Sequence, residues 1–402
     1  MSALSTVIAL SLNKLSPNER ENDVTSPYGL QRLINLAQYC HNGKTKYPLM
    51  EIATNSSMSV YTTFMDFLII SHISDIPKSH GLHEKFDKYF YLWADQLDGI
   101  ISLKLDITSL LKSQRKRLSY DAISMFLKDL EEITRQRPEI MNDSALTLVS
   151  GFSTSFDWET KWVFSRMEFN GEGRDGIMGV PPRIKIGKWF SIHGRAVIVI
   201  NIPLWKNPET SNFIHLTVVI PDVSDTDIFN FQTHFLEDGA VHRASAFNYH
   251  CPLQELRSSL LTQSNYLEII DSWVKGTEER IALDNALVTL PIIDMKSQVP
   301  LLLRRDDFEE IGDRAGGQLF DRGYYHFIKP NNGLQLNGLR IFSKILVDAQ
   351  GVCFQTRGLP QDLETTKDSP PTSKYSINIC RPFMFLIGED VHNLHATGFV
   401  FQ

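Results

Sequence analysis

The sequence predicts an α+β protein, because helix-like and strand-like patterns occupy different parts of its 402 residues. Over about residues 1–145, apolar side chains recur mostly at the spacing of one helix face. From about residue 146 to residue 402 the chain instead carries short runs of β-branched and aromatic residues, bounded by Gly, Pro, Asn or Asp. Helices followed by many strands indicate an architecture built around sheets. No linker divides the chain, so we expect one domain over residues 1–402.

Two helices are expected close to the N-terminus. The first covers about residues 4–15, where the apolar residues suit a helix packed on one face. The second begins with Ser26 as a helix cap and Pro27 at the first helical position. Its buried face is expected to carry Leu30, Leu33, Ile34 and Ala37. A further helical pattern covers residues 119–137.

Strands are expected where the apolar runs are short and continuous, as in strands buried on both faces. Six such runs stand out in the sequence: residues 145–152, 194–204, 213–222, 286–293, 338–348 and 382–390.

The charge of the chain argues against nucleic acid and anionic membranes as partners. The formal net charge is −7, so no overall positive field attracts either of them. No apolar run is long enough to span a bilayer. One dense basic cluster, "KSQRKR", carries Lys112, Arg115, Lys116 and Arg117. It is a solvated loop, a localisation signal, or a site for a polyanion such as a glycosaminoglycan or nucleic acid. It lacks the aromatic residues that stack on nucleic-acid bases.

No group of residues in the sequence reads as an active site. "GFSTS" lacks the second glycine of a nucleophile elbow, so Ser153 is expected to be a strand residue. His80 and His83 could share a helix face but have no carboxylate partner for a metal. We therefore expect no catalytic residue, no metal and no cofactor.

The N-terminal apolar run is not preceded by a basic residue and has no convincing cleavage site. A structural helix is therefore favoured there over a signal peptide. This favours a cytoplasmic location, or an extracellular one if further residues precede Met1.

Seven segments, in order along the chain, resemble the serpin family. The Asn, the Ser-Pro pair and the Gly-x-Thr of a serpin stretch fall on Asn22, Ser26, Pro27, Gly43 and Thr45. In "LTLVSGFSTSFDW" the residues that match a serpin strand are Leu148, Val149 and Trp158. Ser150 stands where the family has Asn, and residues 55–145 match poorly and run shorter than usual.

The later segments match in the same order. "GVPPRIKIGKWF" shares Val180 and Pro181 with a serpin Val-Pro segment. "INIPLW", "LTVVIPD" and "VTLPIIDMKS" resemble three serpin strands. The closing signature of the family is carried by Pro382, Phe383, Phe385, Ile387, Gly398 and Val400.

The resemblance implies a serpin-like fold with three β-sheets, about eight or nine helices and an exposed reactive-centre-like loop at about residues 351–376. Serpins usually inhibit serine or cysteine proteases by suicide. The protease cleaves the loop, which then inserts as a strand of the main sheet and carries the acyl-enzyme with it. Many members do not inhibit and act as carriers, chaperones or signalling proteins.

In this resemblance "LVDAQGVCFQTRG" lies at the hinge of that loop. Gly351 matches the hinge glycine, but Ala349 and Gln350 stand in place of the acidic pair. Bulky and polar residues follow where inhibitory members have small ones. Counting from Gly351, the residues that would enter the sheet are Val352, Phe354, Thr356, Gly358 and Pro360.

The composition of that inward set opposes insertion. Phe354 adds volume to a narrow gap, and overpacking costs about 1–3 kcal/mol. Pro360 cannot donate a hydrogen bond within a central strand. Gly358 adds an entropic cost of roughly 0.5–1 kcal/mol. The hinge therefore favours a non-inhibitory protein.

Two functions remain open at this point. The first is a serpin-fold protein that has lost suicide inhibition and binds a protein partner, as an immune or signalling modulator. The second is an active protease inhibitor with an unusual hinge. Candidate cleavage positions in the loop are the basic residues Arg357, Lys367 and Lys374, together with Leu363 and Thr365.

Overall fold

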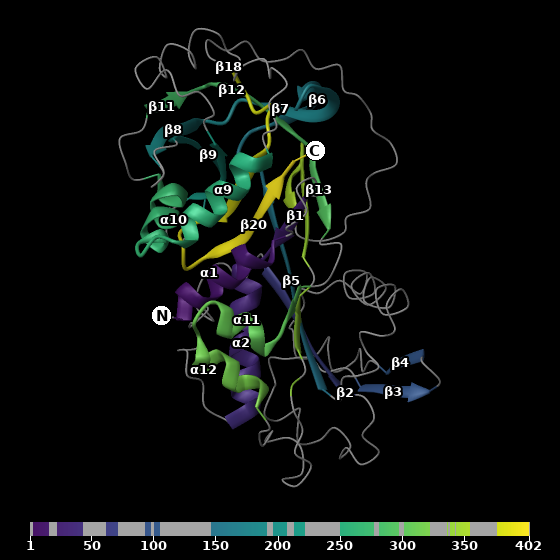
Figure 1. Cartoon of the computed structure of the whole chain (residues 1–402). Helices are drawn as coiled ribbons and strands as arrows, with labels where there is room; N and C mark the ends of the chain where they lie inside the picture. Colours follow the sequence, from purple (N-terminus) through teal and green to yellow (C-terminus); the bar gives the residue numbers. More distant parts are fainter. Residues whose placement is uncertain are drawn as a thin grey trace. The chain divides into compact units, whose positions relative to one another are not determined.

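We analysed a computed structural model of the chain (Figure 1). The residues that it describes are 3–15, 22–42, 62–70, 93–97, 100–104, 146–190, 196–206, 213–221, 250–276, 281–296, 301–321, 336, 338–341, 343–353 and 376–401.

The chain divides into two compact units. The first unit comprises Met1–Leu10, Gly29–Thr154 and Val299–Phe342. The second unit comprises Ser11–Tyr28, Ser155–Gln298 and Ser343–Gln402. Two helices and one long strand each contribute residues to both units. One domain over residues 1–402 stays a prediction.

Both N-terminal helices form where the sequence predicts them. Helix α1 spans Ala3–Lys14 and α2 spans Pro27–Asn42. The predicted face of α2 is buried at Leu30, Leu33, Ile34 and Ala37. The remaining described helices are α9 (His250–Leu261), α10 (Tyr266–Lys275), α11 (Arg305–Glu310), α12 (Arg314–Gly317) and the short 3-10 helix η1 (Gln318–Phe320). The helix predicted over residues 119–137 lies outside the described residues.

The second unit contains a seven-stranded antiparallel sheet, sheet I. Its order is β1-β20-β19-β10-β9-β8-β11. The strands are β1 (Asp23–Thr25), β8 (Arg183–Phe190), β9 (Ala196–Lys206), β10 (Phe213–Pro221), β11 (Ile281–Asp284), β19 (Phe383–Gly388) and β20 (Leu394–Val400). Every residue of β19 is buried, as the continuous apolar run over residues 382–390 predicts. Every residue of β20 is buried as well. Helices α9 and α10 lie together against this sheet (Figure 1).

Sheet II also belongs to the second unit and has the order β18-β12-β7-β6. Its strands are β6 (Trp162–Phe169), β7 (Glu172–Gly179), β12 (Leu287–Pro291) and β18 (Ser376–Asn378). Strand β18 pairs with β12 in parallel, and the other neighbours are antiparallel.

Sheet III has the order β13-β16-β17-β5-β15-β14, and β2 pairs with β5 off this path. Its strands are β2 (Thr62–Ile70), β5 (Leu146–Asp157), β13 (Ile293–Lys296), β14 (Leu301–Leu303), β15 (Gly338–Ile341), β16 (Lys344–Asp348) and β17 (Gly351–Cys353). Two short strands, β3 (Trp93–Leu97) and β4 (Ile100–Lys104), form a separate ribbon.

The strand predictions from residue 145 onward are confirmed, since each of the six runs contains at least one strand. The α+β fold class and its three sheets are confirmed as well. Before residue 146 the structure also contains strands that the sequence pattern did not indicate, namely β1, β2, β3 and β4. No helix within the described ranges is long and apolar enough to cross a membrane.

Candidate functional site

The candidate site is the tight turn between β16 and β17 in the second unit. Four of the five residues of β16 are buried, and Asp348 ends the strand. The Asp348 Oδ1 atom accepts hydrogen bonds from the backbone N–H groups of Gln350 (2.8 Å) and Gly351 (3.2 Å). An aspartate that bonds the backbone two and three residues ahead mimics a turn, so this side chain reverses the chain over two residues.

A tryptophan fixes the position of this turn. The Trp158 Nε1–H group donates a hydrogen bond of 2.6 Å to the carbonyl oxygen of Asp348. The Trp158 ring stacks on Trp162, with 4.2 Å between the ring centroids. Both indoles are buried. The end of β16 is therefore held by a side chain that lies directly after β5.

The turn requires glycine at position 351. Gly351 has a φ angle of +150°, which L residues rarely adopt. A Cβ atom at this position would collide with the carbonyl oxygen of Phe156 and would lie 3.0 Å from Asp157 Cα. The match of Gly351 to a hinge glycine thus has a physical reason, namely the close approach of the β5 backbone.

After Gly351 the chain enters sheet III as a new strand. Strand β17 is antiparallel to both of its neighbours, β16 and β5. Val352 lies opposite Val347 on one side and Phe156 on the other. Its side chain is 1% exposed. Residues 351–353, which were expected to begin the exposed loop, therefore lie between two strands of sheet III.

The structure brings two of the predicted site residues together, Gly351 in the turn and Val352 in β17. The other loop residues and the basic cluster lie outside the described residues: Phe354, Thr356, Arg357, Gly358, Pro360, Thr365, Lys367, Lys374, Lys112, Arg115, Lys116 and Arg117. Ser153 lies in β5 opposite Thr63 of β2. His80 and His83 are outside the described residues, and among the described ones no three His, Cys, Asp or Glu side chains could hold a metal ion.

A buried histidine next to the hinge was not anticipated from the sequence. His395 is the extra residue of a bulge in β20, because Leu394 pairs with Gly388 and Ala396 with Ile387. Its side chain is 0% exposed, and neither ring nitrogen has a hydrogen-bond partner among the described residues. Burial lowers the pKa of His395 to about 4.

The imidazole of His395 lies between aromatic rings from two other elements. Its ring centroid is 5.6 Å from that of Tyr28 in α2 and 5.5 Å from that of Phe156 in β5. Phe156 is also the residue opposite Val352 of β17. His395 therefore contacts Phe156, and Phe156 pairs with Val352 of β17. No local sequence signal marks it, since a single His within an apolar strand is common.

Comparison with solved structures identifies the fold. The chain matches 143 protein chains of known structure. One is native protease nexin-1 with heparin, at a TM-score of 0.60 and 15% identity over 100% of this chain and 98% of that chain. The chain has the serpin fold. No protein-family model matches it, and no curated protein matches it either.

Other serpins of known structure match along the full chain as well. Serpin48 of the insect Tenebrio molitor has a TM-score of 0.58 and 14% identity, over 99% of this chain and 96% of that chain. Thyroxine-binding globulin in complex with thyroxine has a TM-score of 0.54 and 10% identity, over 99% of this chain and 98% of that chain. The serpin-like fold expected from the seven sequence segments is confirmed.

Proposed function

We propose that this chain is a non-inhibitory serpin-fold protein that acts by binding a protein partner, as an immune or signalling modulator. The observation that carries the proposal is the hinge. Suicide inhibition requires that insertion of the cleaved loop lowers the free energy of the protein. It also requires that the insertion is fast. Phe354, Gly358 and Pro360, which follow β17, meet neither requirement.

Part of the insertion is already complete in the intact chain. Strand β17 lies between β16 and β5, and the side chain of Val352 is buried. Burial of an aliphatic side chain stabilises the folded chain by about 1.5–3 kcal/mol. Val352 is already buried before cleavage, so its burial adds nothing to the stability gained when a cleaved loop inserts. Less free energy is therefore left to drive a trap.

Continued insertion would place unsuitable residues in the sheet. Side chains alternate along a strand, so Phe354 and Pro360 would follow Val352 on the same face. The cost of overpacking at Phe354 is about 1–3 kcal/mol. Pro360 would leave one ladder position without a donor. The loop therefore resists insertion where an inhibitor needs it to be easy.

The first residues of β5 are already paired with a neighbouring strand. Residues 147–150 of β5 pair in parallel with β15 over four positions, from Gly338 opposite Thr147 to Ile341 opposite Ser150. A strand that entered beside this part of β5 would first have to break these backbone hydrogen bonds. Such an exchange slows insertion, and an acyl-enzyme hydrolyses while it waits.

Limited proteolysis tests the proposal. The protein is treated with a panel of serine and cysteine proteases that includes a trypsin-like enzyme, for which Arg357, Lys367 and Lys374 are candidate cleavage positions. We expect nicked protein without a covalent complex on a denaturing gel, and a melting temperature close to that of the intact chain. The variant with Phe354→Ala and Pro360→Ala is the matched comparison, because it removes the two largest obstacles to insertion. We expect its melting temperature to rise after nicking.

The alternative function is suicide inhibition of a serine or cysteine protease through loop insertion. It is favoured by Gly351, which stands where inhibitory serpins have the hinge glycine. A complex that survives denaturant, together with a melting temperature raised by tens of degrees after cleavage, would establish this alternative and refute the non-inhibitory proposal.

We further propose that the basic cluster of Lys112, Arg115, Lys116 and Arg117 binds a glycosaminoglycan. One serpin-fold neighbour, protease nexin-1, has a structure with heparin, which supports the proposal. Four clustered cations attract a polyanion, and salt screens that attraction. We expect the protein to elute from immobilised heparin at higher salt than the variant in which all four are replaced by Gln. Equal elution of the two proteins would refute it.

A further inference from the structure

Strand β6 forms an open edge of sheet II in the part of the chain that the structure describes. It pairs with β7 along its whole length, from Trp162 opposite Gly179 to Phe169 opposite Glu172, and with no other described strand. Its second edge therefore carries a row of backbone N–H and C=O groups without a described strand opposite them. Such an edge is a template for pairing with another chain.

The hairpin geometry determines which residues of β6 face the open edge. The two residues between β6 and β7, Asn170 and Gly171, have φ angles of +54° and +83°, which is typical of a two-residue hairpin turn. The residues that flank such a turn, here Phe169 and Glu172, exchange both of their backbone hydrogen bonds, and bonding then alternates along the strand. The backbone groups that point to the open edge are therefore those of Phe164, Arg166 and Glu168. The Arg166 carbonyl oxygen accepts a 3.2 Å hydrogen bond from the exposed Ser165 hydroxyl, which an incoming strand can replace.

The side chains of these three residues share one face, because side chains alternate along a strand. All three are exposed. Phe164 is 39% exposed, more than any other large hydrophobic side chain of the described residues. At Trp162 the same face is buried, and the indole stacks on Trp158. The accessible part of the edge is thus short and carries one aromatic ring, one cation and one anion.

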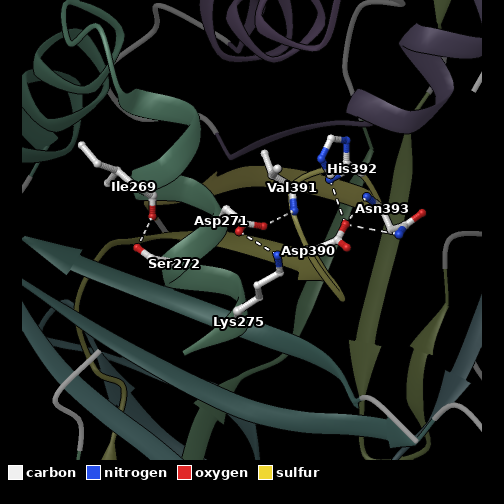
Figure 2. A network of polar contacts seen from close by, with 8 residues as sticks. All are labelled: Ile269, Asp271, Ser272, Lys275, Asp390, Val391, His392 and Asn393. Carbon is white, nitrogen blue, oxygen red and sulfur yellow. Dashed lines mark hydrogen bonds and ion pairs between the residues drawn. The ribbon is translucent and has the colours of Figure 1, made fainter. Parts of the chain in front are cut away.

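The two charges of this face are not neutralised within the described part of the chain. Neither Arg166 nor Glu168 forms an ion pair with a described residue. Helix α10 provides the contrast: Lys275 Nζ lies 2.8 Å from Asp271 Oδ2, and Asp271 also accepts a 3.1 Å hydrogen bond from the Val391 N–H group (Figure 2). Arg166 and Glu168 therefore remain available for charges on a partner.

A second copy of β6 matches this edge. In an antiparallel pair related by a twofold axis, each contact occurs twice, and the outward-facing residues of one strand lie opposite those of the other. With the axis at Met167, Arg166 of each copy lies opposite Glu168 of the other copy. Opposite charges across a strand pair stabilise it, and like charges destabilise it. With the axis at Ser165 or at Arg166, Arg166 lies opposite Phe164 or opposite itself, so the charges select the Met167 register.

Charged residues on an edge strand usually prevent strand addition. An arginine and a glutamate two positions apart act differently, because the same two charges neutralise each other across an antiparallel copy. We propose that β6 binds β6 of a second copy of this chain, with Arg166 opposite Glu168, and joins two copies of sheet II into one continuous sheet. One pair of edge strands buries little area, so the dimer is weak, with a Kd in the micromolar range. Dimerisation through β6 does not involve the hinge and is compatible with either function of the loop.

Sedimentation velocity of the full chain at a series of concentrations tests the proposal. We expect a monomer–dimer equilibrium that weakens as salt screens the charge pairs. Arg166→Glu and Glu168→Arg each place like charges opposite each other, and we expect each to weaken the dimer at least about tenfold. Glu268→Arg makes the same charge change as Glu168→Arg at an exposed position of α10 and is expected to leave the equilibrium unchanged. The melting temperature shows that each variant is folded.

Mixing the two edge variants tests the register. Arg166→Glu carries two acidic residues on the edge and Glu168→Arg carries two basic ones, so copies of one variant repel each other and attract the other variant. We expect the equimolar mixture, and also the double variant Arg166→Glu/Glu168→Arg, to dimerise about as strongly as the wild-type chain. Hydrogen exchange at the Phe164, Arg166 and Glu168 amides is expected to slow in the dimer. A chain that stays monomeric at all concentrations would overturn the proposal. A dimer that neither single variant weakens, or that mixing does not restore, would overturn it as well.

Discussion

Acidification is expected to destabilise the folded protein through His395, by about 2 kcal/mol between about pH 7 and pH 4.5. Burial lowers the pKa of His395 to about 4 in the folded state, against an ordinary value of 6.5. As the pH falls below 6.5, the unfolded chain takes up a proton before the folded chain does. Stability is therefore complete above the ordinary pKa, falls as the pH decreases toward 4, and levels off below that value.

The buried surroundings of His395 explain why protonation is resisted. The ring faces Tyr28 of α2 and Phe156 of β5, and its pKa is shifted by burial alone. An imidazolium at this position would have no carboxylate among the described residues to compensate its charge. The protein must then unfold locally or expel the ring, and either movement affects Phe156, which lies opposite Val352 of the hinge strand.

Urea unfolding at a series of pH values measures this effect. His395→Leu keeps an apolar side chain of similar size in the bulge and removes the titration. We expect the free energy of unfolding of His395→Leu to decrease less between pH 7 and pH 4.5 than that of the wild-type protein. His392→Gln changes an exposed histidine, and we expect its free energy of unfolding to decrease as much as that of the wild-type protein. The same slope in the wild-type protein and in His395→Leu would show that other groups cause the acid sensitivity.

Local sequence patterns were sufficient for much of the fold. The apolar face of α2 and the buried run of β10 depend on residues close together in sequence, so their periodicity and length identify them. The order of strands in sheet III depends on pairing between distant segments, such as β5 with β15 and β2. No local pattern encodes such pairing, and the serpin resemblance rather than composition supplied the three-sheet topology.

The hinge illustrates the same limit at the level of single residues. Gly351 stood out because it matches a family glycine, but the turn that surrounds it was missed. The sequence correctly indicates that a strand ends at Asp348, but the hydrogen bonds of the Asp348 carboxylate to the N–H groups of Gln350 and Gly351 form a turn that the apolar pattern does not indicate. His395 gave no signal, since its burial results from contacts with Tyr28 and Phe156, which are far away in sequence.

Replacement of Gly351 by Ala is expected to destabilise the protein by about 3 kcal/mol and to displace β17 from sheet III. An unfavourable φ angle costs about 1–3 kcal/mol at a non-glycine residue. At Gly351 the added Cβ atom would also collide with the Phe156 carbonyl oxygen, which belongs to a backbone that cannot rotate away. If β17 leaves the sheet to relieve this collision, the burial of Val352 is lost with it.

Gly171→Ala is the matched control for this prediction. Gly171 has a φ angle of +83° in the turn between β6 and β7, and nothing lies within 4 Å of a Cβ atom there. Its substitution therefore adds backbone strain without a collision, and we expect a loss of about 1 kcal/mol. Urea unfolding compares the two variants, and hydrogen exchange at the Val352 and Cys353 amides reports whether β17 stays paired. Equal losses with unchanged exchange would mean that the Phe156 contact does not fix the hinge. A larger loss in Gly351→Ala with faster exchange would make that contact the reason why the loop begins inside the sheet.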